Sequence, residues 1–363
     1  MSRGGLHRRP PRRPLGWLAL VAVLLIVAGL SAWLIPRRHT TAIAEHGGSS
    51  LATNHPVSSF TPPSPQATPA ERHASPTREK LLIHGAGDVN VDPGYIPNLR
   101  VHGFAWAWTG LDGLFRRDDV TVVNLECAIS NLGRPVPKTF NFRCDPKALP
   151  SMRAAGVDVA NQANNHAYDY GPAAVVDGRR NLRGNHIAPV GAGKDAQEAL
   201  APALLEANGW KIAVVGFDKV VDPFPAAIAG PNKPGTAAGH DEDAMVEAVR
   251  VADERADIVI VDIHWGVELD TRPRPGDVDL AHRLVEAGAD VIFGGHSHRL
   301  QPVESYRGRP IFYSLGNFVW PMHSVEGSTT AVAEVTVFAG GNIQARMIPA
   351  YIESSGHPVL RGG

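Results

Sequence analysis

The sequence lacks an excess of charge of either sign. Its 35 lysines and arginines offset 36 aspartates and glutamates, for a formal net charge of −1 over 363 residues. Proteins that bind nucleic acids usually carry a basic excess, so we expect no nucleic-acid partner. Cysteine is also scarce, because the chain contains only Cys127 and Cys144. No second pair is present to complete a four-cysteine zinc site.

The two cysteines have two interpretations. In an extracytoplasmic protein a single pair favours one disulfide between Cys127 and Cys144. Such a bond would stabilise the protein by about 3 kcal/mol in the chain-entropy model for a loop of this length. The alternative is two free thiols or metal ligands.

One long hydrophobic run is present, Leu15–Ile35, and it contains no charged residue. A run of this length can span a bilayer as a helix. Five arginines precede it and two follow it, so the positive-inside rule places residues 1–14 in the cytoplasm and the rest of the chain outside. We therefore expect a single-pass protein of the cell membrane with a signal anchor at 15–35. A cleaved signal peptide ending near Ala42–Ala44 is the alternative.

The composition changes twice after the hydrophobic run. Residues 36–79 are rich in proline, serine and threonine and have few large apolar side chains, which predicts a disordered linker. From Lys80 onward, short apolar runs alternate with amphipathic stretches, which predicts an α/β domain over residues 80–350. One hairpin is expected, with its turn at Asn208-Gly209. Residues 351–363 are expected to form a C-terminal tail.

Five predicted strands end in side chains of the types that bind metals. These are Asp88, Glu126, Asn165 with His166, His264, and His296 with His298. Taken singly, each has an ordinary explanation, such as a turn or helix cap, a solvated strand end or a satisfied buried histidine. In open α/β sheets, however, the carboxyl ends of the strands meet at the edge where ligands bind. The set therefore predicts one site.

The chemistry of this set favours transition metals. Oxygen and imidazole ligands without cysteine suit manganese, iron or zinc better than magnesium or calcium. Glu126, in the middle of the set, can bridge two such ions, which would form a clamp for displacement at phosphorus. We therefore expect two divalent transition-metal ions (Mn, Fe or Zn) as cofactors. His166 would protonate a leaving group, and Asp169 would orient its ring.

Three other features have both a structural and a functional interpretation. Gly294-Gly295, just before the two histidines of "GHSH", are expected to form a tight turn. Asn317 in "SLGNF" either contacts substrate or follows a tight turn at Gly316. Arg143 either binds a polyanion or belongs to a solvated surface.

The motifs "GDVN", "NLE", "NNH", "HWG" and "GHSH", in this order, resemble those of the calcineurin-like metallophosphoesterases. The longer stretches "NLECAIS", "ANNHAYDYG", "IHWGVEL", "GGHSHRLQPVE" and "IFYSLGNFV" resemble the CapA family of poly-gamma-glutamate capsule biosynthesis proteins, over residues 80–350. The resemblance implies an α/β fold, a four-layer α/β/β/α metallophosphoesterase-like sandwich. It also implies one metal held by Asp88, Glu126 and His298, and another held by Glu126, Asn165, His264 and His296.

Two motifs depart from the general phosphoesterase pattern. The usual Asp-x-His is Asp88-Val89-Asn90, and the usual Gly-Asp of the second motif is Asn124-Leu125-Glu126. Asparagine is a weaker ligand than histidine, so the first metal is expected to bind loosely or to be absent. Contacts to a substrate are expected from Asn90, Asn124, Arg143 and Asn317.

The resulting hypothesis is a membrane-anchored, outward-facing protein of poly-gamma-glutamate or capsule biosynthesis. It would carry a binuclear, metal-dependent hydrolase site that acts on a phosphoester or on an anionic amide polymer. The alternative is a non-catalytic component of a polymer synthesis or export complex that retains the fold. The intact His-x-His and Asn-His pairs favour the enzyme, whereas Asn90 leaves room for the alternative.

Overall fold

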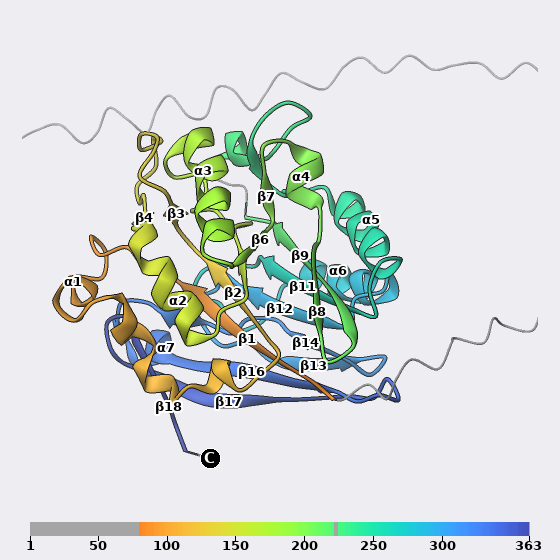
Figure 1. Cartoon of the computed structure of the whole chain (residues 1–363). Helices are drawn as coiled ribbons and strands as arrows, with labels where there is room; N and C mark the ends of the chain where they lie inside the picture. Colours follow the sequence, from red (N-terminus) through yellow and green to blue (C-terminus); the bar gives the residue numbers. More distant parts are fainter. Residues whose placement is uncertain (1–79, 221–223, 363) are drawn as a thin grey trace, which may run out of the picture. The chain divides into compact units, whose positions relative to one another are not determined.

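The computed structural model describes residues 80–220 and 224–362 (Figure 1). The expected signal anchor at 15–35 and the expected linker at 36–79 lie outside these residues. Within the described ranges, no helix has both the length and the apolar character needed to cross a membrane.

The first sheet has eight strands, of which seven follow the order β18-β17-β16-β1-β2-β5-β6, and β15 pairs with β1. Their bounds are β1 (Leu81–Val89), β2 (Val120–Leu125), β5 (Val159–Asn161), β6 (Ala188–Val190), β15 (Asn317–Val319), β16 (Thr329–Val337), β17 (Ile343–Ser354) and β18 (His357–Leu360). Strands β1, β2, β5 and β6 are parallel. The expected domain end at residue 350 is wrong, because β17 continues to Ser354 and β18 pairs with it.

The second sheet has six strands in the order β13-β14-β12-β11-β9-β8. Their bounds are β8 (Ala203–Ala207), β9 (Trp210–Asp218), β11 (Ile258–His264), β12 (Val291–Gly295), β13 (Val303–Tyr306) and β14 (Arg309–Phe312). Strands β9, β11, β12 and β14 are parallel. The predicted hairpin is confirmed in β8 and β9, where Asn208 (φ 50°) and Gly209 (φ 76°) both adopt the left-handed conformation that a two-residue turn requires.

Two small sheets and the helices complete the domain. The small sheets pair β3 (Ala128–Ile129) with β4 (Arg143–Cys144) and β7 (Ala192–Gly193) with β10 (Gly235–Thr236). The α-helices are α1 (Asn98–His102), α2 (Leu149–Ala155), α3 (Gly171–Gly184), α4 (Ala196–Leu200), α5 (Glu242–Asp253), α6 (Pro275–Glu286) and α7 (Val325–Ser328). The 3-10 helices are η1 (Phe104–Leu111), η2 (Leu114–Arg116), η3 (Pro146–Ala148) and η4 (Pro225–Ala227). Helix α5 begins after Asp241, whose side chain accepts a hydrogen bond from the Ala244 N–H.

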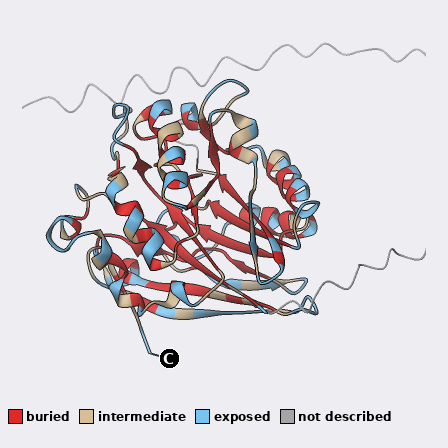
Figure 2. Cartoon of the chain, viewed as in Figure 1, coloured by how far each residue is buried: buried red, intermediate tan, exposed pale blue. Residues whose placement is uncertain are grey.

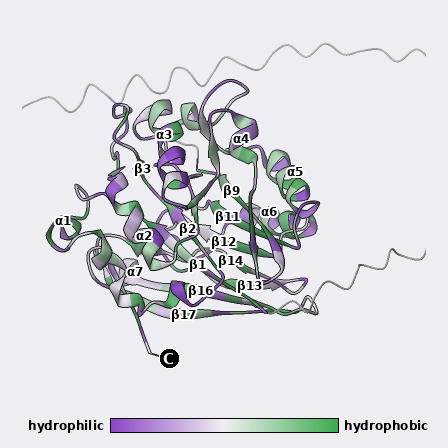
Figure 3. Ribbon diagram, in the orientation of Figure 1, coloured by the Kyte–Doolittle hydropathy of each residue, from purple (hydrophilic) through white to green (hydrophobic). Residues whose placement is uncertain are grey.

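The three largest of four hydrophobic clusters in the described residues hold the elements in layers. Ile83 of the first sheet and Ile260 of the second belong to the cluster between the sheets. Met152 of α2 packs against the outer face of the first sheet, and Val249 of α5 and Leu284 of α6 pack against the second. Buried residues accordingly follow the strands in Figure 2, and β9 and β11 are among the most hydrophobic segments in Figure 3. The predicted mixed α/β class is confirmed.

Candidate metal centre

Five side chains from both sheets meet where parallel strands end. Asp88 lies near the end of β1, Glu126 follows β2, His264 ends β11, and His296 and His298 follow β12. Glu126, His264 and His296 form one group, and Asp88, Glu126 and His298 form another; in each group the ligand atoms lie within 4.8 Å of one another. Glu126 belongs to both groups and therefore occupies the position of a bridging ligand.

The buried atoms of the two groups fit a metal. Glu126 Oε1 lies 3.5 Å from His264 Nε2 and 4.0 Å from His298 Nε2, and Asp88 Oδ2 lies 3.1 Å from His298 Nδ1. Within the part of the chain that the structure describes, both carboxylate oxygens of Glu126 and His296 Nδ1 are buried and make no hydrogen bond. A buried carboxylate without partners is unstable unless it coordinates a cation or becomes protonated. A divalent cation would satisfy these three atoms together.

Burial and mutual charge shift the pKa of each ligand. Burial, followed by the charge of Asp88, raises the pKa of Glu126 well above its ordinary value. Burial lowers the pKa of His264 to about 4 and also lowers that of His296. Burial opposes the protonation of His298 as well, but the charges of Glu126 and Asp88 outweigh it and raise its pKa to about 9. His264 and His296 are therefore neutral at pH 7, the form in which imidazole binds metals.

The segment after β12 is strained at the two histidines. His296 has φ 88° and His298 has φ 53°, in the region that residues other than glycine rarely adopt. The expected turn at Gly294-Gly295 is wrong, because both glycines belong to β12. They are needed for close approach instead: a Cβ on Gly294 would lie 2.1 Å from the Tyr313 carbonyl oxygen. Strained residues cluster at functional sites, and these two carry the candidate ligands.

Three asparagines connect the ligands. Asn124 Nδ2 donates to Asp88 Oδ1 at 2.8 Å and lies 3.0 Å from His264 Nδ1. Asn164 Nδ2 donates to Asn124 Oδ1 at 2.9 Å. Asn165 Oδ1 lies 2.9 Å from His264 Nε2, beside the group of which it is a predicted member. The role of Asn164 was not foreseen from the sequence; the doubled asparagine of "ANNH" was its only signal.

His166 is held by a buried ion pair. Its Nδ1 lies 2.7 Å from Asp169 Oδ2, which also accepts the Phe142 N–H at 2.7 Å. Lys138 Nζ donates to Asp169 Oδ1 and to the Asn165 carbonyl oxygen, both at 2.5 Å. Burial lowers the pKa of His166, although the hydrogen bond to Asp169 opposes this. The structure thus brings the two predicted catalytic residues together and adds Lys138, which no motif of the sequence indicated.

Three of the four expected substrate contacts lie outside the pocket beside the metal ligands. Asn90 is buried, and its Oδ1 accepts the Asp92 N–H at 2.8 Å. Arg143 donates to the carbonyl oxygens of Asn131 and Gly133, each at 3.2 Å, and its guanidinium lies 3.6 Å from the centre of the Tyr170 ring. Asn124 contacts the ligands rather than the pocket. These three side chains are therefore engaged within the protein.

Asn317 lines the pocket and follows a tight turn at Gly316, and its expected contact with substrate stays a prediction. Its Oδ1 lies 2.8 Å from His298 Nδ1, and its Nδ2 donates to the Gly327 carbonyl oxygen at 2.9 Å. Gly316 before it has φ 69°. The carbonyl oxygen of Gly316 accepts the Asp88 N–H at 2.9 Å, so this turn also supports a candidate ligand.

Cys127 and Cys144 form a disulfide, with their Cα atoms 5.7 Å apart. Cys127 directly follows Glu126, and Cys144 Sγ accepts the Val91 N–H at 3.0 Å. The disulfide therefore closes the loop that carries Lys138 and anchors this loop next to the candidate ligand Glu126.

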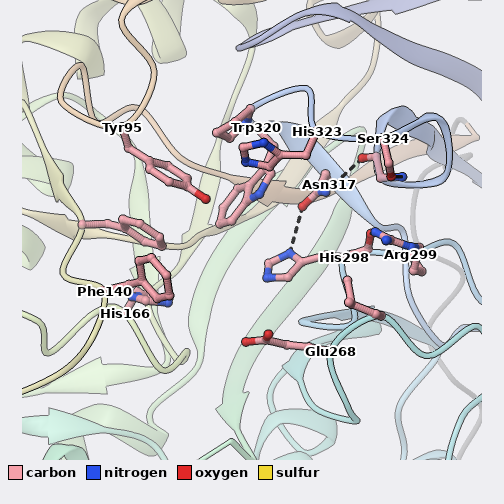
Figure 4. A pocket seen from close by; sticks show the side chains of 14 residues that line it. Tyr95, Phe140, His166, Glu268, His298, Arg299, Asn317, Trp320, His323 and Ser324 are labelled. Atoms are coloured by element: carbon pink, nitrogen blue, oxygen red, sulfur yellow. Dashed lines mark hydrogen bonds between the residues drawn. The ribbon is translucent and has the colours of Figure 1, made fainter. Parts of the chain in front are cut away.

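The pocket beside the ligands has a volume of about 360 Å³ (Figure 4). His166, His298 and Asn317 contribute to its lining. The residues that the sequence did not single out are Tyr95, Phe140, Phe142, Glu268, Leu269, Arg299, Trp320, Pro321, His323, Ser324 and Gly327. Beyond its histidines, the lining therefore includes four aromatic rings, those of Tyr95, Phe140, Phe142 and Trp320.

A buried carboxyl next to the site makes stability depend on pH. Burial raises the pKa of Asp262 to about 7, although Asn161 Nδ2 donates to its Oδ1 at 2.7 Å. The unfolded chain ionises near the ordinary value of 3.8, so the penalty for ionising Asp262 in the folded protein develops between about pH 4 and pH 7. Asp262→Asn keeps the acceptor oxygen. The free energy of unfolding of the variant minus that of the wild type should be larger at pH 8 than at pH 4 by roughly 2–4 kcal/mol, at about 1.4 kcal/mol per pKa unit. Urea unfolding of both proteins in EDTA measures this difference.

The matched control is Asp279→Asn, because Asp279 is exposed on α6. Its difference from the wild type should stay constant across the same pH range. A constant difference for Asp262→Asn as well would show that Asp262 ionises normally.

The fold and the site together define a mixed α/β protein with a carboxylate-and-histidine cluster between the ends of its parallel strands. Residues 83–322 match the family model described as bacterial capsule synthesis protein PGA_cap, and the chain belongs to this family. The resemblance to CapA proteins expected from the motifs is thereby confirmed.

Named relatives come from several bacteria. The chain is 30% identical over 266 residues to "Capsule biosynthesis protein CapA" of Bacillus anthracis, covering 69% of this chain and 64% of that protein. It is 31% identical over 255 residues to "PGA biosynthesis protein CapA" of Bacillus subtilis, covering 69% and 66%. A "probable polyglutamine synthesis accessory protein" of Mycobacterium tuberculosis is 34% identical, covering 64% and 65%. The match thus spans slightly less than two thirds of these relatives.

Among solved structures, the NAD nucleotidase NadN of Haemophilus influenzae superimposes with a TM-score of 0.48 at 15% identity. The superposition covers 79% of this chain and 54% of that one.

Proposed function

We propose that this protein is a membrane-anchored, outward-facing, metal-dependent hydrolase of capsule or polyglutamate synthesis. The observation that carries the hydrolase assignment is Glu126, which is shared by two ligand groups and has both carboxylate oxygens buried without a hydrogen bond among the described residues. Family membership and the names of the relatives support the polymer context. The uncharged run Leu15–Ile35 supports the anchor and the orientation.

Two divalent ions, manganese, iron or zinc, would each take one of the two ligand groups. Asp88, Glu126 and His298 would hold one ion, and Glu126, His264 and His296, with Asn165 beside them, would hold the other. The chemistry that such ions supply is polarisation of the reacting group and activation of water at neutral pH. The residues around them fix the ligand geometry, because Asn124 donates to Asp88 and contacts His264.

His166 transfers a proton to the leaving group. Its Nδ1 is engaged by Asp169, which leaves Nε2 as the ring nitrogen without a hydrogen bond in the described part of the chain. Hydrolysis adds water to the phosphorus or the amide carbon, breaks the bond to the leaving oxygen or nitrogen, and transfers one proton to that atom. Lys138 and the Phe142 N–H hold the Asp169 carboxylate, so the imidazole has one orientation.

His166→Ala tests this proposal. We expect the turnover of phenyl phosphate or diphenyl phosphate, whose leaving oxygen needs a proton, by the manganese-loaded full chain to fall about 10²–10⁴-fold, the usual contribution of a general acid. Circular dichroism and elemental analysis should show unchanged folding and metal content.

His240→Ala is the matched control, since His240 is exposed and no side-chain contact engages it within the described ranges. It should leave turnover unchanged. Wild-type turnover that survives His166→Ala would remove His166 from the reaction.

One observation favours a second function, that of a non-catalytic component of a polymer synthesis or export complex. Asn90 takes the place of the histidine of the general motif, and its side chain is committed to the Asp92 N–H. The group of Asp88, Glu126 and His298 therefore offers three ligands. A protein that holds a single ion and hydrolyses neither ester would fit this role.

A further inference from the structure

One side of the pocket consists of aromatic rings. We call Tyr95, Phe140, Phe142 and Trp320 the aromatic wall. The ring centroids of Tyr95 and Phe142 lie 4.3 Å apart, and the Trp320 ring stands nearly perpendicular to both, with centroids 5.8 and 5.9 Å away. Phe140 is 62% exposed at the edge of the wall. The faces of such rings attract organic cations.

A free carboxylate faces the same pocket. Glu268 follows β11, is exposed, and lines the pocket. Across residues 80–220 and 224–362, no hydrogen bond or ion pair engages its side chain. Figure 4 shows its carboxylate directed toward the space between His166 and His298. An exposed carboxylate alone is ordinary, but this one lines the same pocket as a candidate ligand, His298, and four aromatic rings.

The backbone fixes Glu268 relative to the metal ligands. Leu269, with φ 65°, donates its N–H to the Ser297 carbonyl oxygen at 2.7 Å, between the two ligating histidines. Gln301 Nε2 donates to the Asp270 carbonyl oxygen at 3.0 Å. Burial raises the pKa of Tyr95, and the charges of Glu126 and Glu268 raise it further, so the field of Glu268 reaches the aromatic wall.

When a metal holds His298 as a neutral ligand, Arg299 is the cation that remains among the lining residues, and no ion pair joins it to Glu268 within the described ranges. Arg299 donates Nη1 to the His298 carbonyl oxygen at 2.8 Å. In Figure 4 it lies on the other side of His298 from Tyr95 and Phe140. The pocket therefore combines a cationic floor, when metals are bound, with a wall that is aromatic and negative.

We propose that the aromatic wall and Glu268 bind an organic ammonium group, so that the pocket selects a zwitterionic ligand with its anionic reacting group at the candidate metal centre. The placement of the anionic group rests on the proposed function. Two sources supply this chemistry: a phosphoester that carries an alkylammonium group, or the amino end of an anionic amide chain.

Binding by the manganese-loaded full chain tests the proposal with two matched pairs of ligands. Phosphocholine is compared with 3,3-dimethylbutyl phosphate, which has the same shape without the positive charge. Tri-glutamate is compared with its N-acetyl form. We expect calorimetry to give about tenfold tighter binding for the ammonium-bearing member of at least one pair, as cation–π and carboxylate contacts at a partly desolvated site predict. The pair that shows the preference identifies the source.

Two variants assign the preference to residues. Glu268→Gln and Phe140→Ala change exposed side chains and should each reduce it severalfold, with unchanged affinity for the uncharged or acetylated member. Glu254→Gln is the control, because Glu254 is another exposed carboxylate without a side-chain partner in the described residues and lies before β11, at the opposite end of that strand from His264. It should leave the preference intact.

The outcomes separate this inference from the proposed function. Equal affinities within both pairs, no binding of any of the four ligands, or a preference that Glu268→Gln leaves unchanged would each overturn it. A protein that prefers the ammonium ligands but hydrolyses no ester keeps this inference and loses the hydrolase. A protein that hydrolyses a phosphate ester but shows no preference for the ammonium ligands keeps the hydrolase and loses this inference.

Discussion

The full chain is expected to hold two equivalents of manganese, iron or zinc, and His296→Ala is expected to hold one or none. His296 belongs to the group with Glu126 and His264, and its buried Nδ1 makes no hydrogen bond within the described part of the chain. Removing one imidazole leaves that group with fewer ligands, and the shared Glu126 transmits the loss to the other group. Elemental analysis after reconstitution and desalting measures the content.

The control for this experiment is again His240→Ala, which should hold as much metal as the wild type. Two equivalents in the wild type that fall in His296→Ala support the binuclear site. One equivalent or none in the wild type, after reconstitution with each metal, contradicts it and favours the non-catalytic component.

The candidate ligands could be predicted because strand ends are a local feature. Asp88, Glu126 and His264 each end or follow a short apolar run, and parallel pairing brings such ends to one edge. The hairpin at Asn208-Gly209 could be predicted for the same reason, since two residues with positive φ define its turn. Elements set by local pattern are thus read directly from the chain.

The remainder of the site depends on contacts between distant segments. Lys138 reaches Asp169 from a loop that the disulfide closes, and neither residue's neighbours in sequence indicate the pairing. Trp320 and Tyr95 meet only because β15 lies beside β1. Likewise, Gly294-Gly295 resembled a turn, whereas the close approach of Tyr313 is what requires glycine there. Such requirements arise from packing and leave no periodic signal.

Glu126→Gln is expected to have opposite effects on stability with and without metal. Burial, followed by the charge of Asp88, raises the pKa of Glu126, so the ionised carboxylate destabilises the metal-free folded protein above that pKa. In EDTA at pH 8 the glutamine variant should therefore be more stable than the wild type by about 1–3 kcal/mol, the scale for an unsatisfied buried group. Metal at a thousandfold excess over Kd should stabilise the wild type by about 4 kcal/mol.

Metal should add little to the stability of the variant, because an amide cannot replace a bridging carboxylate. In manganese the wild type should therefore be the more stable protein, the opposite of the order in EDTA. Urea unfolding of both proteins in EDTA and in manganese measures this reversal, with Glu254→Gln as the control that shifts in neither condition. A wild type that is the more stable protein in EDTA would mean that Glu126 is satisfied by the fold itself. The absence of hydrogen bonds to the Glu126 oxygens among the described residues would then no longer indicate a metal, and the hydrolase proposal would lose the observation that carries it.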